Sequence, residues 1–296
     1  MKFKNIALTL LLAGGLSTSC IKEDHSECRN VYRLALSYKG DGQTEIFADK
    51  INKVNMYVFD ARNVCVASGV LSETDLESRL TALPSLEPGD YKVVCIGNAH
   101  QTGVESLSDG GLDQVVFAPE SYWEGETVTG NDPLYWALTE YQITPFNAKQ
   151  VAQTRTAEFK SSHYDVYVEI SGLQHQTKAG EQPVVEITGL SPMTDFMNTP
   201  KGDPITYLMD ASYNEDAGFT AHACIMRQAD MKSVNLKVAY PDGTLIAEVN
   251  FADHIAYNHI DVTQQECVIP FRIEVTPLSV QINTPTWFIE NIIPEF

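Results

Sequence analysis

The sequence has few cysteines and none of the short motifs on which enzyme and metal sites are most often built. Six of the 296 residues are Cys, and no two form a CxxC pair, so zinc ribbons and thioredoxin-like redox sites have no support. GxSxG, HExxH, P-loop and GxGxxG sequences are also missing. The sequence therefore predicts a protein that is not an enzyme and that carries neither a cofactor nor a metal ion.

Basic residues are scarce as well. The chain has 20 Lys and Arg against 39 Asp and Glu, and its formal net charge is −19. Nucleic-acid binding depends on neutralising phosphates with Lys and Arg, and adsorption to an anionic lipid surface depends on the same charges. We therefore expect no nucleic-acid partner, and we interpret most of the acidic residues as a solvated surface that keeps an exported protein soluble.

Long hydrophobic runs are missing, and one short run lies at the N-terminus. The first five residues carry two Lys, residues 6–12 are apolar except for Thr9, and residues 13–19 are mostly small and uncharged. This order is typical of a secretory signal peptide. The apolar part is too short to span a bilayer, which needs about 20 residues. We expect residues 1–19 to be removed, and loss of the two Lys takes the net charge from −19 to −21.

Cys20 stands where a lipoprotein signal peptidase would act. Small Thr18 and Ser19 precede it, as in a bacterial lipoprotein signal, although the usual Leu three residues before the cysteine is here Ser17 and Leu16 lies one residue further back. We expect Cys20 to be acylated and to hold the protein in the outer membrane. The alternative is a cleaved signal followed by an incidental cysteine.

The residues after Cys20 carry a second targeting feature. Lys22, Glu23 and Asp24 resemble the Lys-acidic-acidic signal that sends lipoproteins of the Bacteroidetes to the outer face of the outer membrane. We interpret 20–30 as a lipidated tether with a surface-export signal. An ordinary charged linker is the alternative.

The rest of the chain alternates short apolar strands with turns, and no amphipathic helix of 12 or more residues is evident. Residues 98–113 are predicted to form a loop with a short helix, and residues 192–215 an irregular excursion. The sequence predicts two all-β sandwiches with a boundary near 145–150. The predicted strands cover residues 31–37, 54–59, 65–71, 91–96, 135–143, 151–159, 163–170, 184–187, 234–240, 244–251 and 271–275.

Five cysteines remain if Cys20 is acylated, so at least one is unpaired. Cys65 and Cys95 both lie in apolar stretches that resemble strands. They either pair across strands or remain as small buried thiols, and we favour buried thiols.

Three groups of residues have the chemistry of a catalytic or metal site, and for each we favour a structural interpretation. One is a histidine pair beside an aspartate, one a cysteine near a histidine, and one an acidic glycine-rich loop without the ligand spacing of an EF-hand. The groups are His254 and His259 with Asp253, Cys95 with His100, and Asp109 to Asp113.

An aromatic stretch keeps a binding function open. Surface β-sandwich proteins also bind glycans, and such sites often present exposed Trp or Tyr. We favour packing of Trp136 and Tyr141 between the domains over a glycan site. The stretch contains Tyr122, Trp123, Tyr135, Trp136 and Tyr141.

The ordered set of features in the first 100 residues resembles the FimB-type fimbrial anchor subunits of Bacteroidetes type V pili. Cys28 follows Cys20 by eight residues, and the strands 54–61 (VNMYVFDA) and 86–98 (LEPGDYKVVCIGN) carry the Tyr-Val-Phe-Asp and Pro-Gly-x-Tyr patterns of that family. The usual proline after the second cysteine is Arg29 here. No sharp motif of the family stands in the second half.

The resemblance implies two tandem transthyretin-like β-sandwich domains, here 31–147 and 148–296. It also implies a subunit at the base of a pilus, held by lipid and partnered by stalk fimbrillins through strand exchange. Stalk subunits lose their first strand to a protease that cuts after Arg or Lys, and an anchor is expected to keep it. A cut after Lys39 would make the chain a polymerising stalk or tip subunit, which is the alternative beside a glycan-binding lipoprotein.

Overall fold

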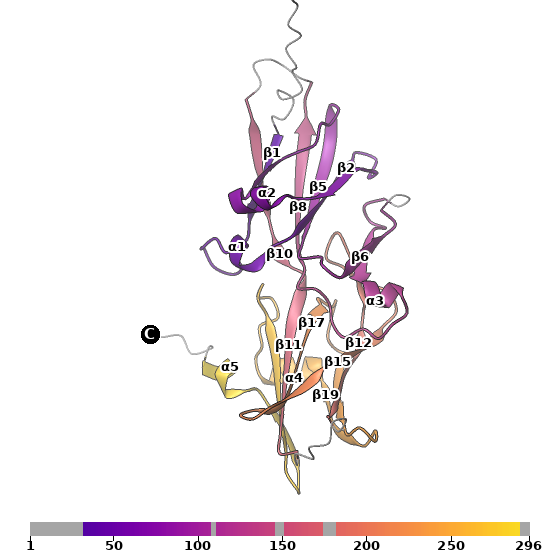
Figure 1. Cartoon of the computed structure of the whole chain (residues 1–296), viewed down its shortest axis with the longest axis vertical. Helices are drawn as coiled ribbons and strands as arrows, with labels where there is room; N and C mark the ends of the chain where they lie inside the picture. The colour runs from indigo at the N-terminus through magenta and orange to yellow at the C-terminus, as the bar shows by residue number, and fades with distance from the viewer. Residues whose placement is uncertain (1–31, 108–110, 146–150, 174–181, 291–296) are drawn as a thin grey trace, which may run out of the picture.

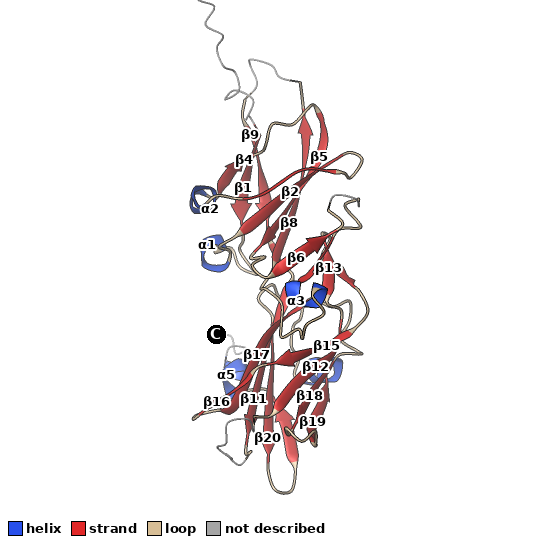
Figure 2. Ribbon diagram, turned by 45° about the vertical axis from the view of Figure 1, so that its right-hand side comes forward, coloured by secondary structure: helices blue, strands red, loops and turns tan. Residues whose placement is uncertain are grey.

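The computed structural model describes residues 32–107, 111–145, 151–173 and 182–290. These residues form two β-sandwiches stacked end to end, the N-terminal one at the top of Figures 1 and 2 and the C-terminal one at the bottom. The all-β class and the two sandwiches expected from the sequence are confirmed. The described helices are short: α1 (Phe47–Lys50), α2 (Glu73–Ser78), α3 (Glu120–Trp123), α4 (Phe251–Tyr257) and α5 (Thr286–Glu290).

The first sandwich consists of a three-stranded and a five-stranded sheet. The smaller sheet has the order β4-β1-β9, and the larger has the order β10-β8-β5-β2-β3. The smaller sheet contains β1 (Tyr32–Ser37), β4 (Leu80–Ala82) and β9 (Gln153–Glu158). The larger contains β2 (Val54–Asp60), β3 (Cys65–Val70), β5 (Gly89–Gly97), β8 (Tyr135–Ile143) and β10 (Lys160–Ser161).

The larger sheet is buried on both faces, which explains why β2 is almost continuously apolar. Met56 and Val58 pack against the smaller sheet, whereas Tyr57 and Phe59 belong to a second apolar cluster on the opposite face. Successive side chains of a strand point to opposite faces, so one strand serves both cores.

A third sheet covers that opposite face and joins the two halves of the chain. Its order is β14-β13-β7-β6, and β7 pairs antiparallel with β13. Two strands come from each half: β6 (Thr102–Glu105), β7 (Val116–Pro119), β13 (Met193–Asp195) and β14 (Pro200–Lys201). Phe196, just after β13, is fully buried and stacks edge-on against Phe117 with ring centroids 4.7 Å apart.

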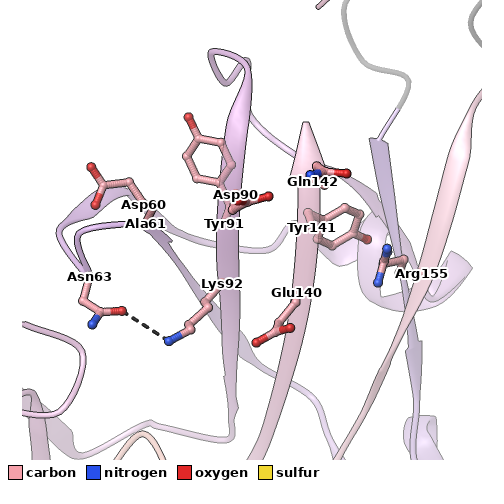
Figure 3. Close-up of a pocket in the computed structure, with 10 residues that line it drawn as sticks. All are labelled: Asp60, Ala61, Asn63, Asp90, Tyr91, Lys92, Glu140, Tyr141, Gln142 and Arg155. Carbon is pink, nitrogen blue, oxygen red and sulfur yellow. Dashed lines mark hydrogen bonds between the residues drawn. The ribbon is translucent and has the colours of Figure 1, made fainter. Parts of the chain in front are cut away.

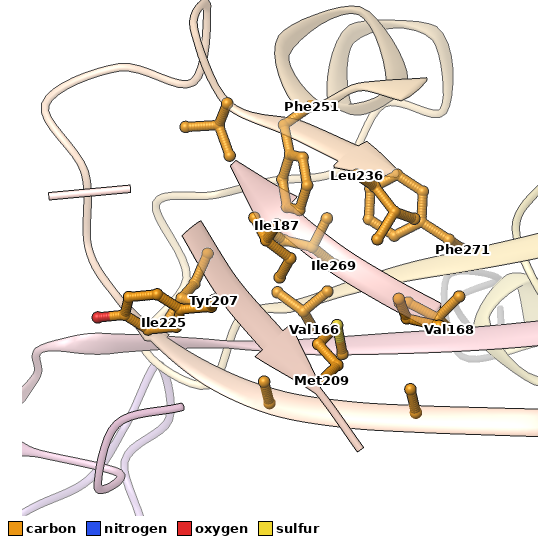
Figure 4. Close-up of a cluster of buried hydrophobic side chains, with 14 of the residues drawn as sticks. Val166, Val168, Ile187, Tyr207, Met209, Ile225, Leu236, Phe251, Ile269 and Phe271 are labelled. Carbon is orange, nitrogen blue, oxygen red and sulfur yellow. The ribbon is translucent and has the colours of Figure 1, made fainter. Parts of the chain in front are cut away.

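The second sandwich has sheets of the orders β16-β17-β11-β20-β21 and β15-β12-β18-β19. Its core is one large apolar cluster, in which Val166, Ile187, Leu236 and Phe271 are fully buried (Figure 4). Burial of one such side chain contributes about 1.5–3 kcal/mol. The first sheet contains β11 (His163–Ser171), β16 (Ala211–Asn214), β17 (Gly218–Met226), β20 (Val268–Val275) and β21 (Val280–Asn283). The second contains β12 (Val184–Leu190), β15 (Ile205–Met209), β18 (Asn235–Ala239) and β19 (Leu245–Asn250).

Several stretches differ from the sequence-based expectation, and strand β17 (Gly218–Met226) was not expected at all. The loop expected at 98–113 contains strand β6, and the excursion expected at 192–215 contains β13 to β16. Strands β9 and β10 follow the boundary expected at 147 and 148, yet they pair with β1 and β8 of the first sandwich. The first sandwich therefore takes strands up to Ser161.

Candidate functional site: the first strand and the junction between the sandwiches

Strand β1 lies in the middle of its sheet. All six of its residues pair in parallel with β9, while only Arg33 to Ala35 pair with β4. The alternating side chains of Tyr32, Leu34 and Leu36 are buried in the first core. The chain's own first strand therefore fills the slot between β4 and β9.

Side chains fix the beginning of β1 to the end of β8. The Tyr141 hydroxyl donates to the Arg33 carbonyl oxygen at 2.6 Å, and the Thr144 backbone N–H donates to the Tyr32 hydroxyl at 2.9 Å. Tyr32 and Tyr141 also meet edge to face, with ring centroids 6.3 Å apart.

A carboxylate fixes the other end of β1. Glu45 accepts hydrogen bonds from the Tyr38 N–H at 2.8 Å, the Ser37 hydroxyl at 2.7 Å and the Phe47 N–H at 3.0 Å. Arg79 Nη1 lies 3.1 Å from Glu45 Oε2. Burial by itself raises the pKa of Glu45, but these donors and Arg79 outweigh it and hold the pKa below its ordinary value. Glu45 therefore stays ionised and closes the turn that follows β1.

The possible cleavage position after Lys39 lies in that turn. Lys39 is exposed, whereas Tyr38 beside it is fully buried. A protease can therefore reach the bond after Lys39, but a cut there would leave β1 held by its buried side chains and by Glu45.

The same turn meets the second sandwich at Glu266, just before β20. Glu266 accepts a hydrogen bond from the Tyr38 hydroxyl, one from Lys50 Nζ at 2.6 Å and one from the Tyr135 hydroxyl at 3.1 Å. Burial favours a raised pKa for Glu266, but these donors prevail and lower it. The pKa of Tyr38 and that of Tyr135 rise far above the ordinary value, through burial first and then through Glu266.

Further hydrogen bonds surround this contact. The Gln265 N–H donates to Asp41 at 2.8 Å, and the Ser161 N–H donates to the Gln265 side chain at 2.9 Å. Arg227 in turn donates to the Val262 carbonyl at 3.0 Å. The loop before β20 is therefore attached directly to the turn that ends β1, so the first strand and the junction form one connected unit.

A polar pocket of about 270 Å³ lies at the end of the first sandwich away from the junction (Figure 3). Its lining mixes carboxylates with two cations, and Lys92 donates to Asn63 at 3.3 Å. Arg155 lies over the Tyr141 ring, 5.6 Å from its centroid. The pocket presents polar and apolar surface alike, and the aromatic ring of Tyr141 is buried. The lining comprises Asp60, Ala61, Asn63, Asp90, Tyr91, Lys92, Glu140, Tyr141, Gln142 and Arg155.

The aromatic stretch does not form one exposed surface. Tyr135 and Tyr141 belong to the first core, and Tyr122 packs against the core of the second sandwich. Trp136 packs on the cluster that contains Phe196 of the second half, as expected for the junction. The expectation for Tyr141 was wrong, because β8 carries it to the far end of the first sandwich, beside Arg33.

The other candidate residues are placed as follows. The Cys95 thiol is buried, which raises its pKa to about 12 and makes it a poor nucleophile. His254 is buried in the second sandwich, where its ring stacks on Phe271 at 4.1 Å and Nε2 lies 2.9 Å from the Pro270 carbonyl oxygen. Cys65 and Cys95 are both free, as favoured, although Cys65 is only half-buried.

Several predicted site residues lie outside the described part of the chain. These are Cys20, Lys22, Glu23 and Asp24, together with Asp109 of the acidic loop. Within the described residues, the ligand atoms of one group of His, Cys, Asp or Glu side chains converge, namely those of His163, Asp165 and Cys224. The sequence analysis did not single out this group. Across the same described ranges, no helix combines the length and the apolar character needed to cross a membrane.

Comparison with known proteins gives a family match over most of the chain. The sequence model of the fimbrillin-A-associated anchor proteins Mfa1 and Mfa2 matches residues 25–293. The fimbrial anchor protein Mfa2 from Porphyromonas gingivalis has a similar structure, with a TM-score of 0.66, 14% identity and coverage of 86% of this chain and 96% of that one. A search of curated proteins found no match.

Two further solved structures share the fold. A candidate adhesin from Bacteroides ovatus has a TM-score of 0.68 and 16% identity, with coverage of 86% of this chain and 93% of that one. A candidate polysaccharide-binding protein from Bacteroides thetaiotaomicron has a TM-score of 0.66 and 15% identity, with coverage of 85% and 95%. At these identities the likeness shows the fold alone.

Proposed function

This chain belongs to the family of fimbrillin-A-associated anchor proteins, and from that premise we propose that it holds a pilus to the outer membrane as a lipid-anchored subunit. The family is a fimbrial one rather than an enzyme family, and it implies contact with other fimbrial subunits at the cell surface. In detail, acylated Cys20 provides the attachment, and the subunit limits assembly of the pilus.

The slot that β1 fills in the uncut chain is the observation that carries this proposal, together with the expectation that the chain is not cut after Lys39. A subunit that extends a fibre by strand exchange needs an open slot, into which the strand of a neighbour is added. Here the slot is occupied by β1, which is fixed by Tyr141 at one end and by Glu45 at the other. Such a subunit takes no donor strand into this slot, so growth of the pilus stops at this side of it. In strand exchange with a stalk fimbrillin, this chain acts as the donor or pairs through an open sheet edge.

The acyl chains on Cys20 supply the attachment. One acyl chain holds a protein only marginally, while each buried methylene adds about 0.8 kcal/mol, so several chains make release slow. The surface of the protein is no substitute, because the net charge of −21 that remains after loss of Lys2 and Lys4 from the −19 of the full sequence is repelled by anionic lipid. The residues up to Asn30 act as a tether between the lipid and the first sandwich.

Replacement of Cys20 tests the attachment. Cys20→Ala removes the acylation position and leaves both described sandwiches intact, because the residue lies outside them. We expect the variant in the soluble fraction and its pili in the medium. Protein that still pellets with membranes, with pili still on the cells, would contradict the proposal.

The export signal provides the matched control. Combined replacement of Lys22, Glu23 and Asp24 by Ala leaves Cys20 in place. This variant should remain in the membrane fraction but lose its accessibility to protease added to whole cells. Release of this variant into the soluble fraction would show that the tether residues, rather than acylation, determine attachment.

A further inference from the structure

Four side chains with metal-ligand chemistry lie on one face of the central strand pair of the second sandwich. His163 and Asp165 are two residues apart on β11, and His222 and Cys224 are two residues apart on β17. Residues two apart in a strand share a face. The antiparallel register places Asp165 directly opposite Cys224 and Tyr167 opposite His222, so the other three side chains surround the Asp165 carboxylate.

The distances between their polar atoms are those of a compact cluster. Cys224 Sγ lies 3.1 Å and His222 Nε2 lies 2.9 Å from Asp165 Oδ1, while His163 Nε2 lies 4.0 Å from Asp165 Oδ2. The ligand atoms of His163, Asp165 and Cys224 all lie within 4.8 Å of one another. Bonds of about 2.0–2.3 Å from a central ion to N, O and S ligands reach the atoms of these three residues after side-chain rotation, and His222 joins them by turning from its contact with Asp165.

The ring of His163 is oriented as in a metal ligand. Its Nδ1 lies 3.0 Å from the Leu134 carbonyl oxygen, which only accepts, so Nδ1 carries the proton of the neutral ring. The lone pair on Nε2 then faces the Asp165 carboxylate, so two hydrogen-bond acceptors lie against each other. The His163 side chain is 4% exposed, so water does little to separate these two acceptors. Metal-bound histidines usually donate their other ring N–H to a carbonyl in this way.

We propose that His163, Asp165, His222 and Cys224 bind a zinc ion. The set of two imidazoles, one thiolate and one carboxylate suits Zn²⁺ in a tetrahedral site. Cys224 gives its thiol proton to solvent and becomes a thiolate, and the proton on His222 Nε2 moves to Nδ1, so one proton is released per ion. His222 is 43% exposed and gives the ion a way in.

The ion would join strands β11 and β17 of the second sandwich. His163 also forms a hydrogen bond with the Leu134 carbonyl, which precedes β8 of the first sandwich, so this ligand lies at the junction. Zinc bound here stabilises the folded chain, because an ion that binds only the folded state shifts the unfolding equilibrium.

Zinc titration of the full-length chain in detergent, after removal of metals with a chelator, tests the proposal. Calorimetry should give one Zn²⁺ per chain with a Kd of about 1 μM or lower, and excess Zn²⁺ should raise Tm by about 5 °C. Co²⁺ as the probe should give a thiolate-to-metal charge-transfer band. Wild-type protein that binds no Zn²⁺, or that gives no thiolate band with Co²⁺, would overturn the proposal.

Variants assign the binding to these residues. Cys224→Ser should weaken binding about 100-fold and remove the cobalt band, and His222→Ala, at a half-exposed position, should weaken binding about tenfold while the fold is retained. Cys267→Ser is the matched control, since Cys267 is a buried free thiol of the same sandwich outside the cluster, and it should bind Zn²⁺ as the wild type does. Equal binding by wild type and His222→Ala, or loss of binding in Cys267→Ser alone, would place the ion elsewhere and refute the site.

Discussion

The first strand of each sandwich lies between an antiparallel and a parallel neighbour, but the two strands are held differently. β11 pairs with β17 from His163 to Ile170 and with β20 from Asp165 to Ser171. β1 pairs with β9 along its whole length but with β4 only from Arg33 to Ala35. The backbone ladder holds β11 on both sides, whereas β1 depends more on side chains at its ends.

The difference concerns how firmly the backbone holds each first strand. A strand with one short ladder opens at a lower free energy than a strand with two long ladders. In the strand exchange that we propose for the stalk subunits, the first strand of the first sandwich is the one that a neighbour replaces. We therefore expect the contacts of Glu45 and Tyr141 with β1 to help retain this strand.

The largest expected effect is at the end of β11. Gly172 has φ +79°, and a Cβ there would clash with the Val275 carbonyl oxygen of β20. Gly172→Ala should lower the free energy of unfolding by about 3 kcal/mol or more, because left-handed strain and the clash add. Urea unfolding followed by circular dichroism measures the loss.

A second glycine provides the control for that prediction. Gly243, in the turn between β18 and β19, has φ +87° and nothing within 4 Å of its Cβ position. Gly243→Ala should cost only about 1–2 kcal/mol from backbone strain. Equal costs at the two glycines would show that the end of β11 is not tightly packed against β20.

The next effect concerns the end of β1. Glu45→Ala leaves the Tyr38 and Phe47 N–H groups without their acceptor and should cost about 2 kcal/mol. It should also speed hydrogen exchange of the β1 amides, measured by mass spectrometry. Glu248→Ala, which breaks an exposed 3.6 Å pair with Lys237, should cost about 0.5 kcal/mol and leave β1 exchange unchanged. Unchanged β1 exchange in Glu45→Ala would mean that the ladder with β9 alone holds the strand.

The smallest effect is a pH dependence at the junction. The pKa of Glu266 in the folded protein is lower than its ordinary value of 4.5. Its carboxylate therefore stabilises the fold fully above pH 4.5, and this contribution is lost as the pH falls through the lower folded value. The stability difference between wild type and Glu266→Gln should shrink from pH 6 to pH 3 in urea titrations. A constant difference over this range would show that the charge of Glu266 does not matter.

The local patterns of the sequence predicted the strands of the clear hairpins but missed others, among them the central strand β17. The hairpin of β2 and β3 and that of β18 and β19 were both recognised, because turn residues separate two apolar stretches in each. The family resemblance, noted on motifs of the first 100 residues, is confirmed by the match over residues 25–293. Short helices such as α4 were missed because they are held by tertiary packing rather than by a long periodic pattern.

Long-range pairing was not predictable in the same way. The parallel pairing of β9 with β1 joins residues more than 100 positions apart, and nothing local marks β9 as a partner of the first sandwich. The third sheet is likewise formed by strands from both halves. The two alternations His-x-Asp at 163–165 and His-x-Cys at 222–224 were visible, but only the register of β11 with β17 brings them together.

The N-terminus of the mature protein tests the central claim, that this subunit is anchored by lipid and keeps its first strand. The chain is extracted from outer membranes with detergent, and its intact mass and N-terminal peptide are measured by mass spectrometry. Our account predicts an acylated Cys20 as the first residue, followed by an uncut chain that contains β1. A mature N-terminus at Gly40, with no peptide of residues 20–39 in the extract, would contradict it, because such a chain would have lost both the lipid and the strand that fills its slot.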